Sequence, residues 1–176
     1  YHDINVSKTQ PIDLLSPKTK NFVHSVKPKN QRLEIYNSGQ IMQAIKRDER
    51  VLGVAPKINA QVFYNVGSVD LTGVINGIDP DEENRLFMFS DYVTSGNYLD
   101  LKNIPNSIIL GKGVADKMAA NLGDVVQVTT SKGERMQLKV VGFFQSGLQD
   151  LDRVQSYCSI NTTQKLLGVS NNYITD

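Results

Sequence analysis

Cysteine and histidine are scarce in this sequence, which holds one cysteine, Cys158, and two histidines, His2 and His24. A single cysteine excludes a disulfide bond within the chain, and its place in a strand-like run favours a buried core position over a nucleophile. Neither histidine has a carboxylate or a cysteine at the spacing of metal ligands, and no serine lies in a G-x-S-x-G motif. The sequence therefore predicts no catalytic residue, no metal site and no cofactor.

Long apolar runs and an excess of one charge are also lacking. The longest apolar runs, around Val140-Val141 and Phe143-Phe144, are far shorter than the roughly 18 to 20 residues of a membrane helix. The net charge is +1, which gives no global field to attract nucleic acid. The 176 residues are 40% hydrophobic, enough to build the core of one domain or two small subdomains. Because an initiator methionine and a signal peptide are absent, we expect a fragment of a larger protein.

The most regular stretch is residues 107–128, which reads as strand, glycine turn, helix, glycine stop and strand. Ile108, Ile109 and Leu110 form a short β-branched run that predicts the strand. Apolar residues then recur at helical spacing, and Gly123 is expected to end the helix before a strand that begins near Asp124. The expected buried face of this helix consists of Val114, Ala115, Met118, Ala119 and Leu122.

The turn Gly111-Lys112-Gly113 has two interpretations. Glycines between a strand and a helix N-terminus can bind a phosphate. The Walker spacing is absent, however, because Gly113 follows Lys112 directly, and Asp116 stands where a dinucleotide-binding fingerprint has its third glycine. A tight turn that folds the helix back on its strand is the favoured interpretation.

Patterns in the rest of the chain predict further strands and helices. Pro56 makes the first part of the run at 51–66 an edge strand or the entry to a strand, and the two residues Gly67 and Ser68 predict a long hairpin. The N-terminal part is predicted to hold a strand at 1–7, an irregular connection at 8–30, a strand at 33–36 and a helix from the N-cap Ser38 to Arg47, whose buried stripe is Ile41, Met42, Ala44 and Ile45. Two hairpins are predicted, one with strands at 51–66 and 69–78 and one with strands at 125–130 and 136–144. The C-terminal part is predicted to hold a strand at 154–160, a helix capped by Asn161 or Thr162 with Gly168 as its stop, and a strand from Tyr173.

Four acids within residues 79–83 could be taken for a calcium loop, but the glycine that such a loop needs is absent. Helix capping explains the same residues: Asp79 caps, Pro80 takes the first helical position and the acids complement the positive helix end. The aromatic-rich run that follows is expected to be core, and Ser95-Gly96-Asn97 is expected to be a turn. The expected core residues of this run are Leu86, Phe87, Phe89 and Tyr92.

The order of several short motifs resembles a known family, the extracytoplasmic domain of MacB/FtsX-type ABC transporter permeases, and most closely the lipoprotein-releasing permeases. The motifs are VLGVAPKI (51–58), VINGIDPDEENRL (74–86), SGNYL (95–99), IILGKGVADKM and LGDVVQV in the 107–128 stretch, and VVGFF (140–144). The resemblance covers residues 38–176. It implies an α+β fold in which a porter-like βαβ subdomain, residues 1–79 and 154–176, carries an inserted mixed α/β subdomain of the Sabre type, residues 80–153.

The resemblance also implies a function without catalysis. In such permeases a cytoplasmic ABC ATPase hydrolyses ATP, a second permease subunit completes a dimer, and this domain, on the periplasmic face of the bacterial inner membrane, couples the cycle to lipoprotein release. MacB-like efflux is the alternative within the family, and a secreted binding module is the alternative outside it. The motif GKGVAD favours lipoprotein release over efflux. The hairpin at residues 129–135 is short, whereas the permease that recruits the periplasmic carrier has a long loop there, which argues against direct carrier recruitment.

Two polar, glycine-containing connections between apolar strands are the expected contact points for a lipoprotein or another periplasmic partner, because such connections lie at the surface. They are the hairpin tip at residues 131–135 and the loop at residues 147–152. The predicted partner-binding residues are Ser131, Lys132, Gly133, Arg135, Gly147, Gln149 and Asp150.

Overall fold

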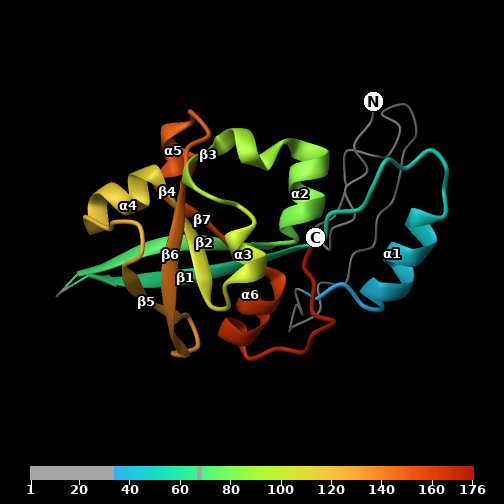
Figure 1. Cartoon of the computed structure of the whole chain (residues 1–176). Helices are drawn as coiled ribbons and strands as arrows, with labels where there is room; N and C mark the ends of the chain where they lie inside the picture. Colours follow the sequence, from blue (N-terminus) through green and yellow to red (C-terminus); the bar gives the residue numbers. More distant parts are fainter. Residues whose placement is uncertain (1–33, 67–68) are drawn as a thin grey trace, which may run out of the picture.

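A computed structural model describes residues 34–66 and 69–176 of the chain (Figure 1). The predicted strand at 1–7, the irregular connection at 8–30 and both histidines lie outside these residues. The helices are α1 (Ser38–Lys46), α2 (Pro80–Phe87), the 3-10 helix η2 (Phe89–Tyr92), α3 (Asp100–Asn103), α4 (Lys112–Met118), α5 (Gln149–Asp152) and α6 (Ile160–Leu167). The strands are β1 (Lys57–Val66), β2 (Val69–Ile78), β3 (Val93–Gly96), β4 (Ser107–Gly111), β5 (Val125–Thr130), β6 (Arg135–Phe144) and β7 (Gln155–Ser159).

The seven strands form one mixed sheet in the order β3-β6-β4-β7-β2-β1-β5, and β6 also pairs with β5. This extra pairing closes β1, β2, β7, β4, β6 and β5 into a ring, with β3 added beside the end of β6. Two pairings are parallel, β2 with β7 and β4 with β6, and the others are antiparallel. Both predicted hairpins, β1–β2 and β5–β6, are confirmed, and so is the α+β class.

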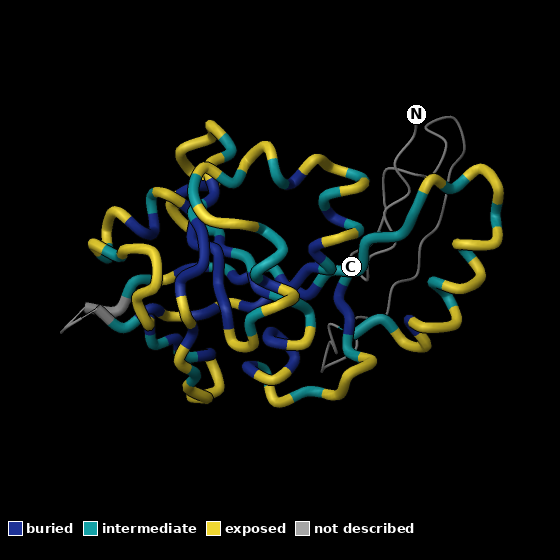
Figure 2. Tube along the Cα trace, viewed as in Figure 1, coloured by how far each residue is buried: buried dark blue, intermediate teal, exposed yellow. Residues whose placement is uncertain are grey.

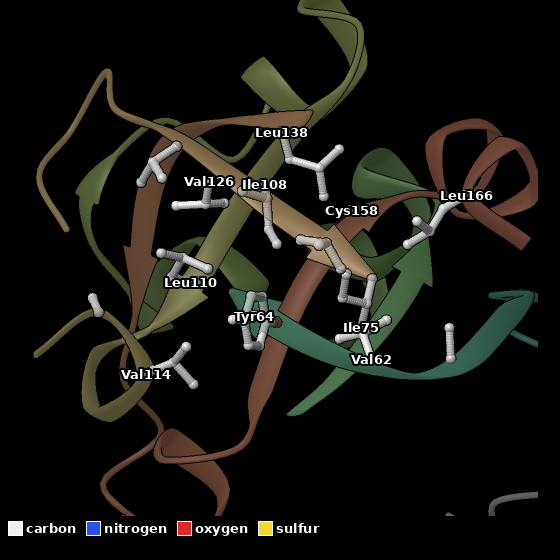
Figure 3. Close-up of a cluster of buried hydrophobic side chains, with 14 residues drawn as sticks. Val62, Tyr64, Ile75, Ile108, Leu110, Val114, Val126, Leu138, Cys158 and Leu166 are labelled. Carbon is white, nitrogen blue, oxygen red and sulfur yellow. The ribbon is translucent and has the colours of Figure 1, made fainter. Parts of the chain in front are cut away.

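The interior of the ring holds the larger hydrophobic cluster, which Figure 3 shows in close-up. Along β1 buried residues from Ile58 to Tyr64 alternate with exposed ones, as the two-residue period of a strand requires. Cys158 lies in this cluster and is fully buried, so its predicted core position is confirmed. The cluster includes Ala60, Val62, Tyr64, Ile75, Ile108, Leu110, Val126, Val128, Leu138 and Val140.

Two helices complete this cluster. Val114 and Ala115 of α4 join it, and so does Leu166 of α6. Figure 3 shows Val114 and Leu166 at opposite sides of the cluster, so the two helices pack against different ends of the ring interior. Thr163 of α6 packs where a Cβ atom on Gly77 would lie, 2.6 Å from the Thr163 hydroxyl oxygen. The glycine therefore lets α6 approach the sheet closely.

A smaller cluster lies outside the ring, beneath η2 and α3. Its members include Phe89, Leu101, Ile109 and Phe144. Neighbouring residues of β4 point to opposite faces, so Ile108 fills the ring while Ile109 packs under this outer layer. Strand β4 is therefore buried on both faces, which explains its uninterrupted apolar sequence.

The structure corrects the predicted aromatic core. Phe89 is buried at 3% exposure, but Phe87 and Tyr92 are exposed at 51% and 44%. The Phe87 ring instead lies under the ammonium group of Lys57, with 4.9 Å from the Lys57 Nζ atom to the ring centroid. The predicted turn at Ser95 and Gly96 is also wrong, because both residues belong to β3 and pair with β6.

The boundaries of three helices differ from those predicted. Helix α4 ends at Met118, where Ala119 takes a left-handed conformation with φ 50°, so the expected end at Gly123 is wrong and Leu122 is 49% exposed. Helix α6 is capped by Ser159, whose hydroxyl accepts from the Thr162 N–H, and not by Asn161 or Thr162. The strand β7 passes directly into α6, so the last strand residue is also the cap.

In α1 the predicted cap is wrong as well. Ser38 is the first residue of the helix, and Asn37 holds the cap position without a side-chain cap bond. The Ser38 hydroxyl donates instead to the Asn172 carbonyl at 2.9 Å. Ala44 is exposed, and the other predicted stripe residues are half-buried. Within the described residues neither 34–36 nor 173–174 forms a strand, although the Ile35 N–H donates to the Ile174 carbonyl at 2.8 Å.

Strands from both predicted subdomains lie in the same sheet. β1, β2 and β7 come from residues assigned to the porter-like part, and β3 to β6 come from the inserted part. The two sets meet at β4–β7 and at β1–β5.

Candidate functional site

The hairpin tip at residues 131–135 is an exposed, hydrogen-bonded turn. The Thr130 N–H donates to the Glu134 carbonyl at 2.8 Å, and the Gly133 N–H donates to the Thr130 carbonyl at 2.9 Å. Gly133 has φ 87°, a left-handed conformation that glycine adopts without strain. Ser131, Lys132, Gly133 and Arg135 are all exposed, as predicted, and the tip presents two cations to solvent.

The loop at residues 147–152 is exposed at its tip and fixed at its base. Asp152 is buried at 6% exposure, and its Oδ1 atom accepts from the Ser146 N–H at 2.7 Å and the Ser146 hydroxyl at 2.8 Å. Gly147, Gln149 and Asp150 are exposed, and Leu148 between them is 62% exposed. No sequence pattern marks Asp152 as the anchor, because its contact with Ser146 forms only in the folded loop.

These two predicted contact regions lie at opposite ends of β6. The hairpin precedes the strand and the loop follows it, and Figure 1 shows the hairpin tip and α5 at opposite ends of the sheet. A strand of ten residues spans roughly 30 Å. Figure 2 shows exposed segments at both ends. The structure therefore does not bring the seven predicted residues into one site.

The turn Gly111-Lys112-Gly113 is packed against another part of the chain. A Cβ atom on Gly111 would lie 2.5 Å from the Asp152 carbonyl oxygen, and one on Gly113 would lie 2.7 Å from Arg153 Cγ. Lys112 pairs with Asp116 at 2.9 Å, one helical turn on. These glycines allow close approach of α5 to α4, which accounts for them without a phosphate.

The acidic run at residues 79–83 caps α2, as predicted. The Asp79 side chain accepts from the Asp81 and Glu82 N–H groups, and Pro80 is the first helical residue. Within residues 34–66 and 69–176 no group of three or more metal-binding side chains occurs. Over the same part of the chain no helix has the length and apolar character to cross a bilayer.

A junction at the start of β1, not predicted from the sequence, joins distant parts of the chain. We call Lys57, Asn59, Thr175, Asp176 and Glu83 the β1 junction. The Lys57 N–H donates to the Asp176 carbonyl at 2.8 Å, and the Lys57 carbonyl accepts from the Thr175 and Asp176 N–H groups at 3.0 and 3.1 Å. The Asn59 amide donates to the Asp176 carboxylate at 2.6 Å.

The Lys57 side chain extends the junction to α2. Its ammonium group donates to Glu83 Oε1 at 2.7 Å, and the two side chains are 33% and 7% exposed. Local sequence patterns contain no signal for this pair, because its members are separated by 26 positions.

The fully buried Tyr64 and Cys158 and the half-buried Tyr157 have raised pKa values. Burial raises the pKa of Tyr64, against an opposing contribution from the Ser156 hydroxyl. Burial also raises the pKa of Tyr157, helped by the negative charges of Glu83 and Asp152, and burial alone raises that of Cys158. A neutral, fully buried thiol is a poor nucleophile.

Comparisons with known proteins identify relatives by sequence. Over 113 residues the chain is 31% identical to the lipoprotein-releasing system transmembrane protein LolC of Neisseria meningitidis serogroup B, which covers 58% of the chain and 27% of that protein. It is 28% identical over 129 residues to the protein of the same name from Xylella fastidiosa, covering 68% of the chain and 31% of that protein. The chain thus spans less than a third of the length of these relatives.

Solved structures share the fold. The extracellular domain of the noncanonic ABC-type transporter YknZ from Gram-positive bacteria superposes with a TM-score of 0.59 at 16% identity, covering 82% of this chain and 72% of that one. The periplasmic region of MacB from Actinobacillus actinomycetemcomitans superposes with a TM-score of 0.55 at 15% identity, covering 83% and 63%. A mixed α+β fold of this kind is therefore found in known transporter domains.

The profile of one family, described as MacB-like periplasmic core domain, matches residues 10–175. This match confirms the resemblance drawn from the motifs, together with the periplasmic location and the non-catalytic role that the resemblance implied. The chain belongs to the family of MacB-like periplasmic core domains of ABC transporter permeases.

Proposed function

We propose that this domain couples ATP hydrolysis by a cytoplasmic ABC ATPase to the release of a lipoprotein from the inner membrane. The names of the LolC relatives support lipoprotein as the substrate class. Coupling requires that the domain have at least two arrangements with different affinities for its substrate or partner.

The β1 junction is the structural observation that supports this proposal. Residues 172–176 are hydrogen-bonded to Ile35, Ser38, Lys57 and Asn59, so segments from the two ends of the described chain lie together. Displacement of one segment would act on the other and on β1. In the proposed mechanism the permease moves this region during the ATP cycle, and the sheet carries the movement outward.

The division into subdomains is part of the proposal. In this proposal residues 1–79 and 154–176 are the porter-like part, and residues 80–153 are the Sabre-like part. Every strand contact between the parts runs through β4–β7 and β1–β5 among the described residues. A change in these two contacts would alter the position of one part relative to the other.

The partner-binding loops belong to two surfaces. In this proposal the hairpin tip with Lys132 and Arg135 contacts one molecule, and the loop with Gln149 and Asp150 contacts another, because the two regions lie at opposite ends of β6. The second permease subunit and the lipoprotein are the two molecules that the coupling requires.

MacB-like efflux is the second candidate. The short hairpin favours it, since only residues 131–134 connect β5 and β6. The fold likeness to the MacB periplasmic region agrees with either function.

Reconstitution separates the two candidates. The full-length permease and its ATPase are placed in liposomes that carry a fluorescent lipoprotein, and loss of the lipoprotein to a soluble acceptor is followed after ATP addition. We expect release that requires ATP hydrolysis. An ATPase stimulated by a soluble small molecule, with no lipoprotein released, would instead assign efflux.

A further inference from the structure

Lys57 connects two regions through different parts of the same residue. Its main chain makes three hydrogen bonds of 2.8 to 3.1 Å with Thr175 and Asp176. The Thr175 hydroxyl lies within hydrogen-bond distance of both the Lys57 carbonyl, at 3.2 Å, and the Asn59 N–H, at 3.0 Å. The position of the Lys57 backbone is therefore tied to residues 175–176.

The Lys57 side chain is equally fixed, but to α2. The ammonium group bonds Glu83 Oε1 at 2.7 Å and lies 4.9 Å from the centroid of the Phe87 ring. Both contacts are attractive, since a cation is attracted to a carboxylate and to the face of an aromatic ring. Glu83 and Phe87 lie on α2, one turn apart.

Within the described part of the chain, the Glu83 side chain has one hydrogen-bond partner, Lys57. The residue is 5% exposed, and among the described residues its second oxygen, Oε2, is buried without a hydrogen-bond partner. The ring of Tyr157 lies close enough for the Glu83 charge to raise the pKa of the Tyr157 hydroxyl. A buried carboxylate that loses its only cation is strongly destabilised. Glu83 must therefore follow Lys57 when Lys57 moves.

We propose that Lys57 is a positioning residue that transmits displacement of residues 175–176 to α2 through its ion pair with Glu83. This inference rests on the proposed coupling function and specifies how movement at the β1 junction reaches residues 80–153. The energetic basis is the asymmetry of a buried pair, because breaking it costs far more than replacing both members with apolar side chains. If the pair only stabilised the fold, two apolar side chains could replace it without loss of function. If the pair transmits movement, the same replacement keeps the stability but loses the transmission.

The first test uses amide hydrogen exchange in this chain. Thr175→Pro removes the N–H that donates to the Lys57 carbonyl. With the ion pair intact, we expect exchange in α2, at amides such as Glu83 N–H, to accelerate about tenfold. In the Lys57→Met/Glu83→Leu background, the same Thr175→Pro change should leave α2 exchange within about twofold of that background alone.

A matched control uses an ion pair that joins the same helix, α2, to α3. Lys102 and Asp81 also form an ion pair, but their side chains are 60% and 50% exposed and do not contact the β1 junction. In the Lys102→Met/Asp81→Leu background, Thr175→Pro should still accelerate α2 exchange. Equal acceleration in all backgrounds, or none with the Lys57–Glu83 pair intact, would overturn the proposal.

The second test measures lipoprotein released per ATP hydrolysed in the reconstituted full-length permease. Lys57→Met/Glu83→Leu should keep the melting temperature within about 3 °C of wild type yet lower release per ATP about fivefold. Unchanged release per ATP would overturn the transmitting role. If the wild-type complex hydrolyses ATP without releasing lipoprotein, the proposed function fails, and the exchange experiment still decides whether the ion pair transmits.

Discussion

Gly73 of β2 lies against the ring of Tyr64 of β1, and a Cβ atom on Gly73 would lie 2.4 Å from Tyr64 Cε2. The same Cβ atom would lie 3.0 Å from the Val154 carbonyl oxygen. Tyr64 is fully buried and is the largest side chain of the ring interior. The glycine thus provides the space that the tyrosine ring fills.

Gly73→Ala should therefore lower the free energy of unfolding by about 1 to 3 kcal/mol, because a packed ring and a backbone carbonyl must both shift. Denaturation in urea measures this change. Gly39→Ala is the control, since nothing lies within 4 Å of its Cβ position in α1, and it should be neutral or stabilising by up to about 1 kcal/mol. Equal effects of the two substitutions would show that Gly73 is not a packing requirement.

Asp152→Ala should destabilise the chain by about 2 kcal/mol, because the Ser146 N–H and hydroxyl lose a charged acceptor. The matched control, Asp150→Ala, changes an exposed carboxylate in the same loop and should stay within about 0.5 kcal/mol. Thermal denaturation of both variants tests this. If Asp152→Ala is as stable as its control, the buried carboxylate does not hold the loop.

Stability should fall at alkaline pH. The pKa values of Cys158, Tyr64 and Tyr157 are raised by burial above their ordinary values of 9.0 for cysteine and 10.0 for tyrosine. Below pH 9 these groups are neutral in both states. As the pH rises past these ordinary values, the unfolded chain ionises while the folded chain resists, so the folded state loses stability.

Melting temperatures measured from pH 7 to 11 test this expectation. The melting temperature of the wild type should be constant near pH 8 and should fall progressively above about pH 9. Tyr157→Phe removes one of the three groups, so the melting temperature of this variant should fall less steeply with pH. A melting temperature that stays constant up to pH 11 would contradict burial of these groups in neutral form.

Lys132→Glu with Arg135→Glu should weaken partner contact in the full permease, because both side chains are exposed at the hairpin tip and reversing them inverts the local charge. Chemical crosslinking to the partner should drop several-fold, while the melting temperature stays nearly unchanged. Lys117→Glu with Lys165→Glu makes the same charge change at exposed positions of α4 and α6 and serves as control. Equal crosslinking by both double variants would show that the charges of the hairpin tip do not contribute to partner contact.

Local features of the fold could be predicted from the sequence. The β1–β2 and β5–β6 hairpins, the α2 cap at Asp79 and the Gly168 stop follow from patterns within a few residues, and all four occur in the structure. The helix end at Ala119 could not be predicted, because a non-glycine residue with φ 50° carries no sequence signature. Ser159 and Asn161 are both good cap residues, and only the packing of α6 selects between them.

Long-range relationships could not be predicted. Closure of the ring depends on pairing between β1 and β5, and between β4 and β7, which are separated by many residues. The Lys57–Glu83 pair and the contacts of Thr175 likewise form only when the sheet is assembled. The predicted contact loops were placed at the surface correctly, but their position at opposite ends of β6 required the three-dimensional structure.

The most direct measurement is the distance between two copies of the hairpin tip during the ATP cycle. Lys132→Cys provides an exposed label site, and the native Cys158 is fully buried and should not react. In the proposed dimer of full-length permease subunits, each copy of this domain is labelled, and the distance distribution is recorded without nucleotide and with ATP. Coupling predicts that ATP shifts the distribution to a second, distinct maximum. An identical distribution in both states, in a complex that hydrolyses ATP and releases lipoprotein, would contradict a coupling role for this domain.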